Sequence, residues 1–242
     1  MADFKTHISV SSTLGVAYGV GGYFVFDISI PHCTVAGALC SVAGMLPDLD
    51  SNSSIPQREM LSFVSVIVPM LMIRRFEAFE LTPEYMVFVA GLMYAIIRFG
   101  IGGIFRHFTR HRGMWHSMPA ALIAGLATFL VCLSPELGVR VFKGWAVVLG
   151  FISHLVLDEI YAVDWKGETI RVKKSFGTAL KWIGTNWWWN VSTYGKLAFL
   201  VVLVLSDQSL MDYFGAKPLN VPFSARDWFI DSIGSGNPII FR

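Results

Sequence analysis

The residues best suited to chemistry in this chain are its histidines and the carboxylates near them. The stretch RHFTRHRGMWHS, residues 106–117, holds three of the six histidines of the sequence, His107, His111 and His116. A solvated basic loop would account for the arginines here but not for the histidines, whereas neutral imidazole is a common metal ligand. Gly113 lets the backbone turn so that His111 and His116 face one point. We therefore expect these two to bind a metal, with His107 either a third ligand or an outer neighbour.

Two further motifs supply carboxylates and another histidine. His154 and Asp158 are spaced i, i+4, which on a helix puts both side chains on one face, within reach of one ion. A buried hydrogen-bonded pair is the alternative, although ionisable groups in membrane segments are functional by default. Asp48 and Asp50 follow Pro47 at a predicted helix end, where they either bind a metal and deprotonate its water or cap a turn.

Three more residues complete the set or serve as its control. His7 directly precedes the first apolar segment and is the remaining candidate ligand. Arg112 suits an anionic substrate such as a phosphate, since guanidinium binds phosphate through two parallel hydrogen bonds; anchoring at the membrane surface is the alternative. His32 falls on the opposite side of the membrane in the topology described below. We predict that His32 is not a ligand.

The composition indicates an integral membrane protein. Of the 242 residues only 15% are charged and 54% are hydrophobic, and eight are tryptophan. A net charge of +2 gives no reason to expect a nucleic-acid partner. The three cysteines lie in apolar segments and predict no disulfide framework. The first residues lack the basic segment of a cleaved signal peptide, so insertion is expected to use the internal apolar segments.

The apolar segments predict an all-α fold, a polytopic bundle of transmembrane helices with the metal site at one membrane face. We expect residues 1–205 to form a membrane-embedded, hydrolase-like helical domain and residues 206–242 a C-terminal tail of unknown role. Trp182 and the run 187–189 are typical of an aromatic belt at the membrane interface. The expected apolar segments are 9–30, 33–46, 60–73, 85–105, 118–133, 144–157 and 196–205, with connections at 31–32, 74–84 and 134–143.

If each apolar segment crosses the bilayer once, every candidate ligand falls on one side of it. Before the last segment, that side carries ten lysines and arginines, against four on the other side. Since basic residues accumulate on the cytoplasmic side, we expect the site to face the cytoplasm.

The ordered motifs resemble those of the YdjM-type family of inner-membrane proteins, described as predicted metal-dependent hydrolases, some of them LexA-regulated. The resemblance covers roughly residues 5–160. It implies a bacterial inner-membrane location and the complete site His7, Asp48, Asp50, His111, His116, His154 and Asp158. The HxxxD spacing is also similar to one in zinc-dependent phospholipase C. Two positions depart from the family pattern, Trp115 and the Glu159-Ile160-Tyr161 continuation, and both bear on substrate specificity.

These observations favour a membrane hydrolase that binds one to three divalent ions, with zinc as the expected metal. Its expected substrate is an anionic phosphoester or a lipid-borne molecule. Asp48 or Asp50 would orient or deprotonate a metal-bound water, and Arg112 would hold a phosphate oxygen. A metal transporter or a metal-stabilised structural protein is the alternative. Transport predicts polar residues deep within several segments, whereas the candidates here lie at segment ends. A di-iron oxygenase would need more histidines than this chain has.

Overall fold

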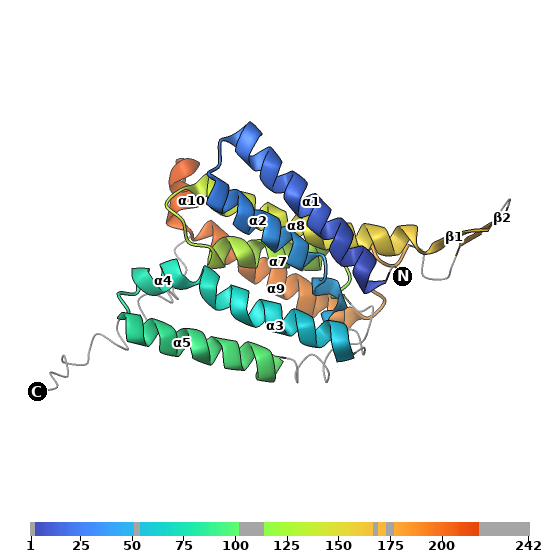
Figure 1. Cartoon of the computed structure of the whole chain (residues 1–242), viewed down its shortest axis with the longest axis horizontal. Helices are drawn as coiled ribbons and strands as arrows, with labels where there is room; N and C mark the ends of the chain where they lie inside the picture. Colours follow the sequence, from blue (N-terminus) through green and yellow to red (C-terminus); the bar gives the residue numbers. More distant parts are fainter. Residues whose placement is uncertain (1–2, 51–53, 102–113, 167–168, 173–176, 218–242) are drawn as a thin grey trace, which may run out of the picture. The chain divides into compact units, whose positions relative to one another are not determined.

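The computed structural model is all-α apart from one short β-hairpin (Figure 1). It describes residues 3–50, 54–101, 114–166, 169–172 and 177–217, without the side chains of 49–60, 101 and 164–172. The chain divides into two compact units, Met1–Val201 and Val202–Arg242. Every described residue of the candidate site belongs to the first unit.

The first two helices form a hairpin. The side chain of Asp3 accepts a hydrogen bond from the backbone amide of Thr6 and caps helix α1, Phe4–Phe26. Asp27 ends α1 in the left-handed region, with φ 54°, and α2 runs from Ile30 to Ala43. The expected turn at Pro31 and His32 was wrong. Both belong to the first turn of α2, because proline is tolerated in the first turn of a helix as well as in a turn.

A second hairpin follows the LPDLD motif. That motif is a 3₁₀ turn, η1, Leu46–Asp50, and α3 then spans Ser54–Leu71 and packs against α5, Pro83–Ala95. Directly after α5 the chain continues as a π-helix, η2, Ile96–Ile101. The connection expected at 74–84 contains a short helix instead, α4, Ile73–Ala78.

The last helix pair of the bundle is α7, Met118–Val131, and α8, Leu137–Ile160. Helix α8 begins earlier than expected, since most of the stretch 134–143 is its first two turns rather than a connection. Strands β1, Val163–Lys166, and β2, Thr169–Val172, then pair antiparallel, with Val163 opposite Val172. Helices α9, Trp187–Leu205, and α10, Gln208–Tyr213, complete the described elements.

Small residues allow the helices to approach closely. A Cβ atom on Gly37 would lie 2.8 Å from the Gly15 carbonyl oxygen, where α1 crosses α2. Gly144 makes a similar approach to Gly125 between α7 and α8, at 3.1 Å. Helices α1, α2, α7 and α8 therefore form one set around a core that includes Cys40, Ala146 and Phe151.

Two arginines close the carboxyl end of α7, the end opposite to His116. The guanidinium of Arg75 donates to the carbonyl of Leu130, and that of Arg140, which is 1% exposed, approaches the carbonyl of Phe129 at 3.5 Å. These carbonyls belong to the last turn of α7, where no further amide of the same helix follows to donate to them. Positive charge at a helix carboxyl end is favourable, so the arginines cap α7 there.

Three described helices, α1, α8 and α9, are long and apolar enough to cross a membrane, at 23, 24 and 19 residues. Helices α2 and α7 are apolar but shorter. The expectation of an all-α bundle with several membrane helices is confirmed.

Candidate metal centre

Five of the predicted ligand side chains meet at one end of the helix set. His7 comes from the first turn of α1, Asp48 from η1, and His116 from the residues before α7; His154 and Asp158 come from the last turns of α8. Two groups have all their ligand atoms within 4.8 Å of one another, the first His7, His154 and Asp158 and the second Asp48, His116 and His154. Figure 1 shows the start of α1 and the end of α8 at the same end of the bundle.

His154 is the residue common to both groups, and its tautomer follows from one hydrogen bond. Its Nδ1 lies 2.8 Å from the carbonyl oxygen of Gly44, at the end of α2. Because a carbonyl oxygen only accepts, Nδ1 carries the proton and Nε2 keeps its lone pair. Metal-binding histidines are oriented in this way by a partner on the other ring nitrogen. His154 can therefore offer one nitrogen, Nε2, to one ion.

That nitrogen faces two carboxylates. Nε2 of His154 lies 3.7 Å from Oδ1 of Asp48 and 3.8 Å from Oδ2 of Asp158, too far for hydrogen bonds. Two ligand atoms on one tetrahedral zinc ion, each about 2.1 Å from it, are roughly 3.4 Å apart. A lone pair facing two negative charges is unfavourable unless a cation lies between them. The spacing and the charges both fit a divalent ion.

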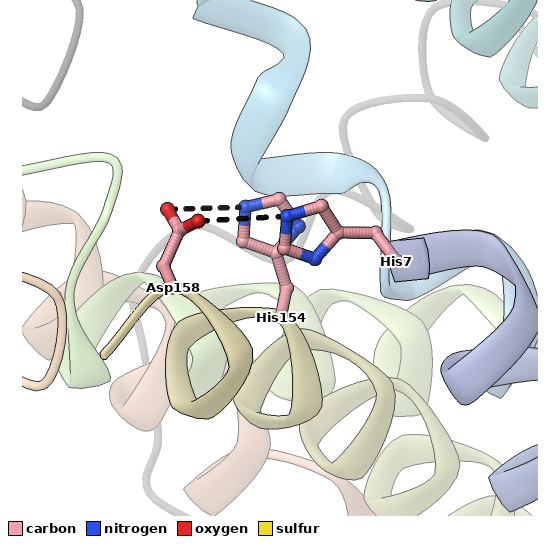
Figure 2. Close-up of side chains that lie close together, drawn as sticks. All are labelled: His7, His154 and Asp158. Atoms are coloured by element: carbon pink, nitrogen blue, oxygen red, sulfur yellow. Dashed lines mark ion pairs between the residues drawn. The ribbon is translucent and has the colours of Figure 1, made fainter. Parts of the chain in front are cut away.

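His7 extends the centre on the side of Asp158. Its Nε2 is 3.5 Å from Oδ1 of Asp158, and its ring stacks on that of His154 with centroids 3.7 Å apart and planes 13° apart. Figure 2 shows both imidazoles side by side, each directed at one oxygen of the same carboxylate. His7, His154 and Asp158 are at most 4% exposed. Within the described part of the chain, Nε2 of His154 and Oδ1 of Asp158 have no hydrogen-bond partner.

His116 extends the centre on the side of Asp48. Its Nε2 is 3.9 Å from Oδ1 of Asp48, and its ring centroid is 5.7 Å from that of His154. His116 is buried, at 2% exposure.

Asp48 is the most accessible of the five, with 17% of its side chain exposed. Partial burial acts to raise the pKa of its carboxyl, but the imidazoles of His116, His154 and His7 beside it outweigh burial and lower the pKa. Asp48 is therefore a carboxylate at neutral pH. Asp48 and Asp158 together put two negative charges in a largely buried site, and a bound divalent cation would neutralise them.

Two residues for which the sequence indicated no role, Trp115 and Gly44, hold the candidate ligands in place. The indole nitrogen of Trp115 donates to the carbonyl of Leu46 at 2.8 Å, joining the His116 turn to the turn that carries Asp48. A side chain on Gly44 would collide with Ser11 of α1, so only glycine allows this close approach. Trp115 had a signal in the sequence, since it departs from the family pattern. The role of the Gly44 carbonyl had none.

The remaining predicted site residues are not brought into this arrangement by the described structure. Asp50 ends η1, but its side chain lies outside the described residues, as do His107, His111 and Arg112 entirely. His32 is in the first turn of α2, at the opposite end of the α1–α2 hairpin from His7, and belongs to neither ligand group.

The YdjM inner membrane protein family matches residues 1–211, a range that includes all five clustered residues. The searches of curated proteins and of solved structures gave no significant match. A family of inner membrane proteins agrees with the three apolar helices, which associate the chain with a lipid bilayer. Because the match covers most of the 242 residues, the chain belongs to the YdjM inner membrane protein family, as its motifs predicted.

Proposed function

We propose that this protein is a membrane-bound metal-dependent hydrolase. The observation that carries the proposal is the unprotonated Nε2 of His154, 3.7 Å from one carboxylate and 3.8 Å from another. Because His154 has one free nitrogen and both ligand groups contain it, the described residues support one ion. His154, Asp158 and Asp48 would hold it, with His7 and His116 completing the set.

Zinc suits this donor set best, since histidine nitrogen and carboxylate oxygen are its usual ligands in catalytic sites. A zinc ion held there would supply Lewis acidity and bring the pKa of a coordinated water close to neutral. Calcium and magnesium prefer sites made of oxygen atoms alone. We therefore propose zinc over either of these.

The protein's own residues divide the remaining work. Asp48 is ionised and partly exposed, so it can accept a proton from water approaching the centre. Asp158 is almost fully buried and would hold His7 and the ion rather than move protons. Asp50, His111 and Arg112 are also proposed as site residues, on the basis of the sequence motifs alone. Arg112 would bind a phosphate oxygen of the substrate.

Phosphoesters are the proposed substrate class because arginines lie within the histidine-rich stretch 106–117, and guanidinium binds phosphate. The two carboxylates of the centre would repel an anionic substrate, so binding of that substrate would also require the metal ion. We propose that the site faces the cytoplasm, because the expected topology puts ten lysines and arginines on its side of the membrane and four on the other side.

The test is phosphoester hydrolysis by the zinc-loaded full chain in detergent–lipid micelles, with soluble and lipid-borne esters. We expect turnover that is lost with chelator and in Asp48→Asn, and kept in His32→Ala. Turnover that survives both the chelator and Asp48→Asn would refute the mechanism. Stoichiometric zinc that raises the melting temperature, with no ester hydrolysed, would favour the metal-stabilised structural protein instead.

A further inference from the structure

Residues 177–186, called the strap below, are joined to the helix end that carries two of the candidate ligands. Glu159 follows Asp158 in the last turn of α8. Its two carboxylate oxygens accept hydrogen bonds from the backbone amides of Gly177 and Ala179. Glu159 belongs to neither ligand group, so this carboxylate anchors the strap one residue away from a candidate ligand.

The strap has little support besides hydrogen bonds. It has no regular secondary structure, and among its residues, all of which the structure describes, Ala179 alone is buried, in a cluster with Leu155 of α8 and Ala120 of α7. Near its other end, the side chain of Asn190 in α9 accepts from the amide of Gly184 and donates to its carbonyl, both at 2.8 Å. A segment with so few buried contacts opens easily, so its position depends on these bonds.

The strap contacts the turn that carries His116 on both sides of that residue. The carbonyl of Lys181 accepts a hydrogen bond from the amide of Met118 at 3.1 Å. On the other side, a Cβ atom on Gly184 would lie 2.9 Å from the sulfur of Met114, so Met114 packs directly against the strap. Met114 and Met118 are each two residues from His116.

The start of α7 depends on the bond from the strap. The amide of Met118 is one of the first amides of α7, which have no acceptor in their own helix. Ser117 precedes the helix, where serine commonly caps such amides, but its hydroxyl donates to the carbonyl of Met114 and caps none of them. The carbonyl of Lys181 is the acceptor that replaces the cap.

We propose that Glu159 is a positioning residue of the metal centre, which holds His116 in place through the strap. Asp158 is held by α8 itself, and the next residue of α8 anchors the segment that holds His116, so the two ligands keep their relative positions. Glu159 begins the continuation that departs from the family pattern, so this role is not one that the resemblance implies. The inference rests on the metal site of the function proposed above, but not on hydrolysis.

The link from Glu159 to the turn of His116 is tested first without metal. Hydrogen exchange of single amides is compared between the full chain in detergent and Glu159→Gln. The amide of Met118 should exchange roughly fivefold faster in the variant, the factor that corresponds to one hydrogen bond of about 1 kcal/mol. Glu136→Gln is the matched control, since this exposed glutamate directly precedes the other end of α8. Unchanged exchange at Met118 in Glu159→Gln would overturn the proposal, whether or not the protein binds a metal.

The effect on the centre is then measured as zinc affinity. Glu159→Gln should bind zinc roughly 10-fold more weakly, the lower end of the effect of residues that orient metal ligands, and Glu136→Gln should bind it as wild type does. The visible spectrum of the cobalt-substituted Glu159→Gln protein should also change, which a general loss of stability would not cause. Unchanged zinc affinity and an unchanged spectrum would overturn the proposal.

A double variant shows whether Glu159 acts through His116. Glu159→Gln should lower zinc affinity in wild type but add little in His116→Ala, because the ligand that the strap holds is then absent. An equal loss in both backgrounds would mean that Glu159 acts on another part of the centre and would refute the proposed path. Absence of zinc binding in wild type would refute the proposed function instead, and exchange at Met118 would still decide whether the strap holds this turn.

Discussion

Replacing Gly150 by alanine tests the contact on which the geometry of the centre depends. Gly150 lies where α8 crosses α2, and an added Cβ would collide with the carbonyl oxygen of Cys40 and lie 3.0 Å from Cβ of Ala43. Both obstacles are rigid parts of a helix, so the two helices must separate. Gly138, in the first turn of the same helix, is the matched control, because a Cβ there meets nothing within 4 Å.

The expected size follows from two opposing effects. Alanine is favoured over glycine in a helix by up to about 1 kcal/mol, a gain that both variants share in part. Overpacking at a rigid contact costs about 1–3 kcal/mol and applies to Gly150→Ala alone. For a chain of this length, that difference corresponds to a melting temperature roughly 2–12 °C lower than that of Gly138→Ala.

The assay uses the buried thiols of Cys33, Cys40 and Cys132, which react with a fluorogenic maleimide only when the protein unfolds. Separation of α2 from α8 would also shift Gly44, whose carbonyl holds the ring of His154, so zinc affinity should fall in Gly150→Ala and not in Gly138→Ala. If Gly150→Ala melts at or above the temperature of Gly138→Ala, the close crossing described above is wrong.

Three further predictions concern the surroundings of the centre. Trp115→Phe keeps the ring but loses the hydrogen bond to Leu46, so the visible spectrum of the cobalt-substituted protein should change; an unchanged spectrum would mean that this bond does not position Asp48 and His116. Zinc affinity should decline as the pH falls, because protons compete with the metal for the histidine nitrogens, and equilibrium dialysis across pH measures this. The lowered pKa of Asp48 means that its contribution to stability is present above its ordinary value of 3.8 and is lost only as the pH falls through the folded-state pKa. Asp48 therefore stays ionised at pH 5, and the zinc lost at that pH should be due to protonation of histidine alone. Glu159→Gln weakens the two hydrogen bonds that this side chain accepts from the amides of Gly177 and Ala179, by about 1–3 kcal/mol in total, and should speed exchange of these two amides but not of those in α2.

Much of the centre could be predicted from local spacing. The i, i+4 pair His154 and Asp158 needed only helix periodicity, and the order of apolar segments was enough to put His7 and Asp48 at the same end. Proline was an ambiguous signal, since Pro31 predicted a turn but lies in the first turn of α2 in the structure.

The features that could not be predicted from the sequence depend on contacts between segments that are far apart in the chain. The carbonyl of Gly44 holds His154, which lies 110 residues away, and a backbone carbonyl has no signature in a sequence. Glu159 was noticed as a departure from the family pattern, yet its partners are amides of a segment with no regular structure. The β-hairpin at 163–172 was also missed. Its apolar residues, Val163, Trp165, Ile170 and Val172, alternate with polar ones, but each run is only four residues long, which is the shortest strand signal a sequence can give.

The proposed function depends on the binding of a divalent ion by the clustered histidines and aspartates. The most direct test is the metal content of the detergent-purified full chain after zinc reconstitution and dialysis, comparing wild type, His154→Ala and His32→Ala. We expect close to one zinc per chain in wild type and His32→Ala, and almost none in His154→Ala. Wild-type protein without bound metal, or equal zinc in all three proteins, would contradict it.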